Sequence, residues 1–187
     1  MVLYCYIDST LGFATNLQLY SLRQAYRDWI YLQEHNDNLT DEKIKEICVF
    51  ITATLGLSLS QLLGQNFPGP HTREGVPAPK KLFENIMPKY FNDTNKYNTL
   101  KNNFFELVDF YDASRHFGLD KDKKRHDKMD DITIYKVNDF LKTAFDIWDY
   151  IILFKKNEKN SQLYEYTNIK DLLDNLEEGN YQEDLIE

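Results

Sequence analysis

Arginine and histidine stand side by side twice near the middle of this chain, as Arg115-His116 and Arg125-His126. An arginine guanidinium can hold a phosphate through two parallel hydrogen bonds, and a histidine imidazole gains and loses protons near neutral pH. Cleavage of RNA without a metal requires a base for the ribose 2′-hydroxyl, an acid for the leaving 5′-oxygen and a cation beside the phosphorane. These four residues, together with Lys121 between them, could fill those roles.

The same residues also have a structural interpretation. Asp112 lies three residues before Arg115 and four before His116, so on a helix its carboxylate can reach either side chain. In that case Arg115 forms an ion pair with Asp112 and the histidines are simply exposed. Residue types alone do not separate this alternative from the catalytic one, and both stay open.

A metal site can be drawn on the same helical face from Asp109, Asp112 and His116. Zinc and manganese accept such ligands. Two acids and a histidine share a face readily by chance in a chain with 30 Asp and Glu. We therefore expect a solvated face there, with no metal and no other cofactor.

The helix that positions Arg115 is predicted to begin at Thr99 and to end at Gly118. Arg115 follows Tyr111 by four residues, so its side chain should continue the core-facing stripe rather than point into open solvent. The stripe itself repeats at helical spacing: Leu100, Phe104, Leu107, Val108 and Tyr111.

Apolar residues at helical spacing predict the remaining helices, and together they indicate an all-α, single-domain bundle of about five to six helices. One of them, ending at Gly64, is apolar nearly all round and must be surrounded by others. The predicted spans are Thr15 or Asn16 to about His35, Thr40 to Gly64, Lys80 to Ile86, Asp130 or Asp131 to about Lys155, and Thr167 to Gly179.

Three segments fall outside the long helices. Residues 1–14 form an N-terminal arm, in which a strand-like run from Val2 to Ile7 has no evident partner, so a strand, an extended arm and a first helical turn all stay open. Residues 65–80 hold four of the five prolines and predict a long loop, either a connector or part of a site. Residues 157–187 form an acidic C-terminal segment with a frayed end.

The bulk composition limits the class of protein. Apolar residues make up 42% of the chain, which is enough for a packed core and excludes a disordered protein. The net charge of -8 argues against broad coating of nucleic acid but permits a small basic site. Arg23 and Arg27, four residues apart on one helix, are expected to form a solvated flank.

Motifs and cysteines narrow the possibilities further. The patterns GxxxxGK[ST], GxGxxG, HExxH, paired CxxC and GxSxG do not occur, so ATP hydrolysis, dinucleotide chemistry and serine hydrolysis are disfavoured. Cys5 and Cys48 are expected to be buried thiols in a reducing compartment. Residues 1–14 do not have the pattern of a signal peptide, and no membrane span is expected, which predicts a cytoplasmic protein with no membrane partner.

Three consecutive stretches, ICVFITATLGLSLSQLLG, KKLFENIMPKYF and NTLKNNFFELVDFYDASRHFG, are followed by the amphipathic VNDFLKTAFDIWDYII. This organisation, over about residues 40–155, resembles the HEPN superfamily. Its members are all-α bundles from prokaryotic toxin–antitoxin and defence systems, and many are ribonucleases. The resemblance implies a metal-independent RNA endonuclease that acts as a homodimer on RNA.

The resemblance also assigns roles to residues. Arg115 would bind phosphate, His116 or His126 would exchange protons, and Lys121 and Arg125 would hold the RNA backbone. The family places its histidine four to six positions after the arginine, whereas here His116 follows at once and ten residues separate Arg115 from His126. Either the loop brings His126 back, or His116 substitutes, or the site is lost and the protein is a non-enzymatic module that binds or scaffolds a protein partner.

Overall fold

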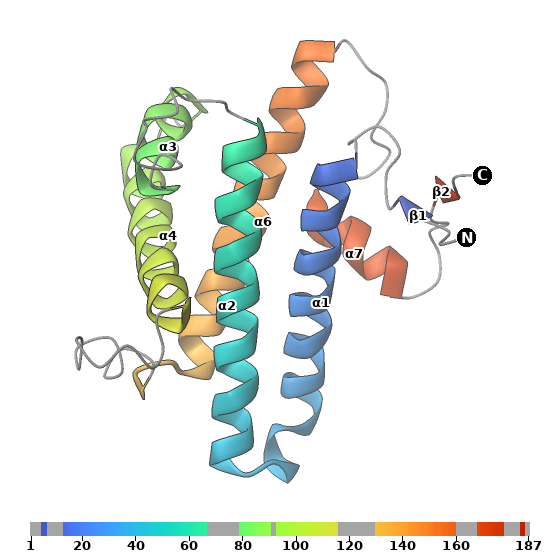
Figure 1. The fold of residues 1–187 in the computed structure, drawn as a ribbon, viewed down its shortest axis with the longest axis vertical. Helices are drawn as coiled ribbons and strands as arrows, with labels where there is room; N and C mark the ends of the chain where they lie inside the picture. The colour runs from blue at the N-terminus through green and yellow to red at the C-terminus, as the bar shows by residue number, and fades with distance from the viewer. Residues whose placement is uncertain are drawn as a thin grey trace.

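The computed structural model describes residues 5–6, 13–66, 79–90, 93–115, 130–159, 168–177 and 184–185. Within them the fold is an all-α bundle of six helices, as predicted (Figure 1). The helices are α1 (Phe13–His35), α2 (Asp41–Asn66), α3 (Pro79–Ile86), α4 (Thr94–Arg115), α6 (Ile134–Lys159) and α7 (Ile169–Glu177). Two short 3-10 helices, η2 (Asn36–Asn38) and η3 (Met87–Tyr90), follow α1 and α3.

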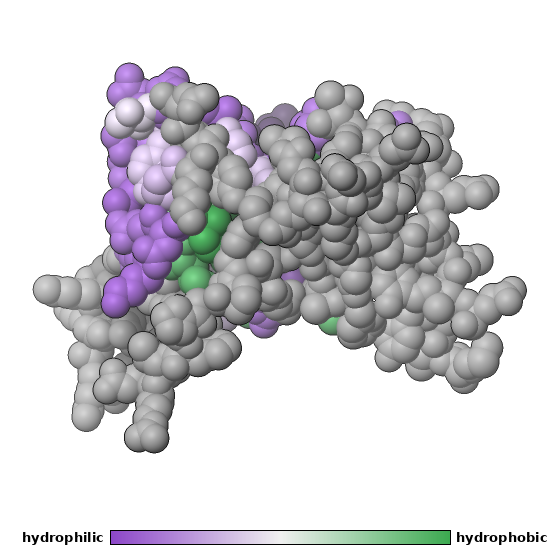
Figure 2. Space-filling view, turned by 90° about the horizontal axis from the view of Figure 1, so that it is seen from above, coloured by the Kyte–Doolittle hydropathy of each residue, from purple (hydrophilic) through white to green (hydrophobic). Residues whose placement is uncertain are grey.

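Helix α2 is the centre of the bundle, packed against α1, α3, α4 and α6. Figure 1 shows it between α1 and α4, with α6 behind. Five of its aliphatic side chains have no exposed surface: Ile51, Leu55, Leu59, Leu62 and Leu63. On the α3 and α4 side, the described surface seen from above is mostly hydrophilic, with a small hydrophobic area in a hollow beside it (Figure 2).

The expectation that no segment spans a membrane stays a prediction, because α2 has the length and composition of such a segment. No charged residue occurs from Ile47 to Asn66. Residues Asp41–Gly64 are, by length and composition alone, long and apolar enough to cross a membrane, and half of their apolar window is buried inside the bundle. A helix surrounded by four others needs the same composition, so the pattern by itself does not separate the two environments.

Buried polar groups fix how α1 lies against α2. The Gln18 side chain donates to Gln61 Oε1 over 2.6 Å, and the Ser58 hydroxyl donates to the Gln18 carbonyl over 3.0 Å. Gln18 is 5% exposed and Ser58 1% exposed, so each hydrogen bond replaces one with water that burial has removed. These bonds specify one register for the antiparallel pair.

Two of the predicted helix starts differ from the structure because another residue caps the helix. Helix α4 starts at Thr94, five residues before Thr99, because Asp93 Oδ1 accepts the N–H groups of Asn95 and Lys96 at 2.8 and 3.2 Å. The polar residues 94–98, before the predicted start at Thr99, therefore belong to α4. Helix α6 starts after Thr133, whose hydroxyl accepts the Lys136 N–H, and not after Asp130 or Asp131.

Other boundaries were predicted more closely. The Thr40 hydroxyl accepts the Lys43 N–H at 3.3 Å and caps α2, as expected. Helix α2 passes Gly64 and ends two residues later, at Asn66. Helix α7 is capped by Asn168, whose Oδ1 accepts the Asp171 N–H at 2.9 Å, whereas the predicted cap, Thr167, lies outside the described residues.

The chain ends meet in a pairing that the sequence did not indicate. Two-residue strands, β1 (Cys5–Tyr6) and β2 (Asp184–Leu185), pair antiparallel, with Cys5 opposite Leu185. Residues 184 and 185 belong to the stretch expected to fray. Strands this short contain too little alternation to be recognised from sequence.

The solvent exposure of Arg23 differs from the prediction, whereas the burial of Cys48 agrees with it. Arg23 is only 8% exposed, so the predicted solvated flank holds for the exposed Arg27 alone. Cys48 is a buried free thiol, and burial raises its pKa to about 11, which keeps it protonated at neutral pH. The side chain of Cys5 lies outside the described residues.

Helices α2 and α4 approach each other closely at Gly56. A Cβ atom placed on Gly56 would lie 2.4 Å from Tyr111 Cβ, which is closer than real carbon contacts. A Cβ on Gly64, in the same helix, would meet nothing within 4 Å. The absence of a side chain at position 56 therefore sets the distance between the two helices.

We expect Gly56→Ala to destabilise the protein by about 2 kcal/mol, because α4 must move away from α2. Gly64→Ala is the matched control and should stabilise it by roughly 0.5–1 kcal/mol through helix propensity. Urea unfolding followed by circular dichroism measures both. Adding Tyr111→Ala to Gly56→Ala should not restore stability, because the clashing atom is the Tyr111 Cβ. Equal effects of the two glycine variants would contradict the close approach.

Candidate functional site

Arg115 is the last residue of α4, and its backbone ends at the lower end of the bundle, beside the start of α6 (Figure 1). The Arg115 side chain and the other predicted site residues, His116, Lys121, Arg125 and His126, lie outside the described residues. The structure thus places the backbone of Arg115, and the arrangement of the site's side chains stays a prediction.

Described ion pairs hold the chain where it returns after the segment 116–129. Lys45 of α2 forms an ion pair of 2.5 Å with Asp130, just after the segment. Lys136 in the first turn of α6 pairs with Glu106 of α4 at 2.7 Å. Helices α2 and α4 therefore both contact the part of the chain that leads into α6.

Two residues of the metal site considered above, Asp109 and Asp112, are described, but His116 is not, so that site stays untested. Asp109 pairs with Lys80 of α3, with 2.6 Å between Nζ and Oδ1, and Asp112 is exposed. Among the described residues no group of three or more His, Cys, Asp or Glu side chains could hold a metal ion. The competing ion pair between Asp112 and Arg115 is not tested, because the Arg115 side chain is not described.

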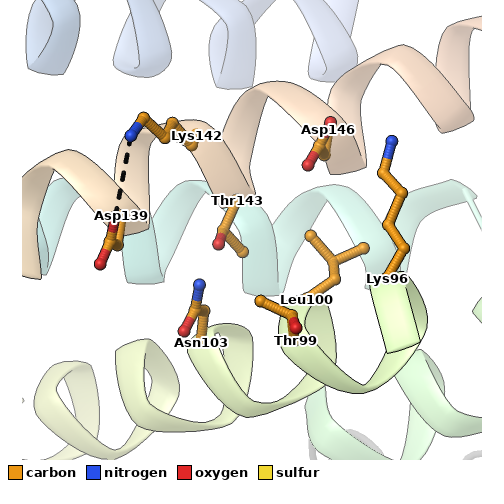
Figure 3. Close-up of a pocket in the computed structure, with 8 residues that line it drawn as sticks. All are labelled: Lys96, Thr99, Leu100, Asn103, Asp139, Lys142, Thr143 and Asp146. Atoms are coloured by element: carbon orange, nitrogen blue, oxygen red, sulfur yellow. Dashed lines mark ion pairs between the residues drawn. The ribbon is translucent and has the colours of Figure 1, made fainter. Parts of the chain in front are cut away.

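A polar groove lies between α4 and α6, away from Arg115, with a volume of about 350 Å³. Figure 3 shows the Thr143 hydroxyl and the Asn103 amide facing each other across it. Lys142 pairs with Asp139 over 3.9 Å at one end, and Lys96 and Asp146 stand at the other. Its lining residues are Lys96, Thr99, Leu100, Asn103, Asp139, Lys142, Thr143 and Asp146.

Two carboxylates of α6 bind a proton more tightly than usual: Asp146, which lines this groove, and Asp149, one helical turn further along. Burial raises the pKa of Asp146, and Lys96 partly offsets the effect. Burial raises the pKa of Asp149 to about 6, the Ile169 N–H opposes that shift, and the nearby carboxylates Asp146 and Asp171 add to it. Asp149 thus exchanges its proton close to physiological pH.

Asp149 also has a structural role. Its Oδ1 accepts the N–H of Ile169 over 2.6 Å and so joins α6 to the start of α7. Ile169, Leu172 and Leu173 of α7 have no exposed surface. Sequence reasoning missed this carboxylate. The one available signal was a pair of acids three residues apart, Asp146 and Asp149, around the buried Trp148.

Chemically, the groove offers two ammonium groups, two carboxylates, two hydroxyls and an amide to a small polar ligand. The phosphate-binding and proton-exchanging groups predicted from sequence belong instead to the other end of α4. No family model, curated protein or solved structure matches the chain. The interpretation therefore rests on the residues themselves.

We expect Asp149→Asn to stabilise the protein at pH 7 by about 2 kcal/mol, with the difference vanishing near pH 4. The pKa of Asp149 is about 6 when folded and 3.8 ordinarily, so the folded state binds the proton more tightly. Its contribution to stability is complete below pH 4, declines as the pH rises from 4 to 6, and stays low above. Asparagine keeps an acceptor for the Ile169 N–H and has no charge to bury.

Urea unfolding at several pH values measures this difference. The exposed Asp139 of the same helix supplies the control, since Asp139→Asn should change stability by less than about 0.5 kcal/mol throughout. A stability difference for Asp149→Asn that is independent of pH would show that the carboxylate is not buried as described.

Proposed function

We propose that the protein is a metal-independent RNA endonuclease of a prokaryotic toxin or defence type, cytoplasmic and active as a homodimer. The supporting observation is that α4 ends at Arg115 beside the start of α6. From Arg115 to Thr133, just before α6, the chain has six Lys or Arg and five Asp, and all six basic residues lie between 115 and 128. Basic side chains are thus frequent near the proposed site and would attract a phosphate backbone.

In the proposed reaction the guanidinium of Arg115 holds the scissile phosphate. One histidine, His116 or His126, removes the ribose 2′-hydroxyl proton, and the oxygen attacks phosphorus. The bond from phosphorus to the 5′-oxygen breaks as that oxygen receives a proton, leaving a 2′,3′-cyclic phosphate and a 5′-hydroxyl. Lys121 and Arg125 hold the flanking backbone.

The purified protein should cleave single-stranded RNA in the presence of EDTA, and Arg115→Ala should reduce the rate by at least about 100-fold. Arg27→Ala is the matched control, because Arg27 is an exposed arginine on α1. Gel electrophoresis of a labelled RNA measures the rate, and circular dichroism verifies that both variants are folded. Absence of cleavage, or equal rates for the two variants, would refute the nuclease.

Replacing both His116 and His126 by alanine should abolish cleavage while RNA binding persists. The reason is that the histidines exchange protons, whereas the cationic side chains Arg115, Lys121 and Arg125 bind the backbone. Fluorescence anisotropy measures binding, which should weaken steeply with salt in both proteins. A double variant that still cleaves would exclude the histidines from the chemistry.

A second candidate function is the binding of another protein, with or without nuclease activity. Helices α1 and α2 expose large apolar side chains, of which Leu17 is 45%, Tyr31 47%, Phe50 56% and Leu57 40% exposed. A partner protein that packed on these two helices would remove this apolar surface from water. This surface is distinct from the end of the bundle at Arg115.

A further inference from the structure

A cleft of about 540 Å³ opens on the outer face of the α1–α2 pair. It is separate from the α4–α6 groove and shares none of its residues. Its volume is within the range of ordinary ligand sites. The residues that line it are Gln24, Asp28, Tyr31, Lys43, Glu46, Ile47 and Phe50.

The Asp28 carboxylate in this cleft lacks part of its hydrogen bonding. Oδ1 accepts a hydrogen bond from the Gln24 side chain at 3.0 Å. Oδ2 is inaccessible to solvent and has no hydrogen-bond partner, and burial raises the pKa of Asp28. A carboxylate that has lost water without gaining a donor is destabilised in its charged form, and a positive charge in the cleft nearby would stabilise that form electrostatically.

The other charged groups of the cleft do not supply that cation. Lys43 is the one basic residue in the lining, and its Nζ lies 2.8 Å from Glu46 Oε2. The lining therefore has two carboxylates against one ammonium. Charge complementarity favours a positively charged occupant.

Two aromatic side chains, Tyr31 and Phe50, line the same cleft as Asp28 and are about half exposed. Tyr31 stacks on His35, with 4.4 Å between ring centroids, which restricts its ring. Phe50 stands across the cleft on α2. Aromatic faces attract cations, and a planar guanidinium stacks on them better than an ammonium does.

The surface beyond the cleft indicates that the cation belongs to a protein. Leu57 follows Phe50 by two helical turns on the same face of α2, and Leu17 lies on α1 in the section joined to α2 by the hydrogen bond between Gln18 and Gln61. A free small cation would leave these side chains in water. An arginine flanked by apolar residues on a partner would cover both features.

We propose that this cleft binds an arginine side chain of a partner protein. The guanidinium lies against Asp28 between the rings of Tyr31 and Phe50, and apolar neighbours of that arginine cover Leu57 and Leu17. This inference rests on the second proposed function, protein binding, and is independent of the nuclease.

The probe is a fluorescent helical peptide of leucine and alanine with one central arginine, titrated against the full chain. The comparison peptide has citrulline in place of arginine, which keeps the shape and removes the charge. The arginine peptide should bind about tenfold more tightly, a difference of about 1.4 kcal/mol. Asp28→Asn should abolish this preference, whereas Asp37→Asn, at an exposed position on η2, should keep it.

Each of the other outcomes would refute a different part of the proposal. If both peptides bind equally and Phe50→Ala weakens both, the apolar surface is a protein-binding site. The proposed arginine site is then refuted. An arginine preference that survives in Asp28→Asn would place the cation elsewhere. Failure of both peptides to bind would refute the cleft together with the second proposed function. Circular dichroism of each variant verifies that it is folded.

Discussion

The rest of the structure depends on the burial of α2, a helix without a charged residue from Ile47 to Asn66. Water contacts with such a helix are unfavourable on nearly every side, so neighbours must cover it. Helices α1, α3, α4 and α6 do so, and the missing side chain at Gly56 lets Tyr111 of α4 come close. The ends of α4 and α6, where the proposed nuclease site lies, are therefore positioned by their contacts with α2.

The helices could be predicted from sequence because each has an apolar face with a clear period. Their boundaries were harder to predict, because several side chains compete to cap a helix and only the folded backbone selects one. Asp93 caps α4, and a run of Asn and Lys follows it before the predicted start at Thr99. Thr133 caps α6, although two aspartates precede it in the sequence. The strand pair at the chain ends depends on contact between residues that are far apart in the sequence.

The candidate sites differ in how much of them sequence could indicate. Arg115 stood out because it continues an apolar stripe near a predicted helix end, and α4 does end there. Asp28 and Asp149 did not stand out, because an aspartate on an amphipathic helix is normally solvated. Their raised pKa values result from burial by neighbouring helices, Asp28 beside α2 and Asp149 beside α7. That contact exists only once the bundle has formed.

The register set by Gln18, Ser58 and Gln61 has a consequence for the order in which the molecule assembles. Helices α1 and α2 are adjacent in the sequence and joined by residues 36–40 alone, so their contacts close a short loop, and short loops form early. They also precede α4 and α6 in the sequence and so leave the ribosome before them. We infer that this hairpin forms during synthesis and shields one side of α2 from aggregation until α4 and α6 arrive.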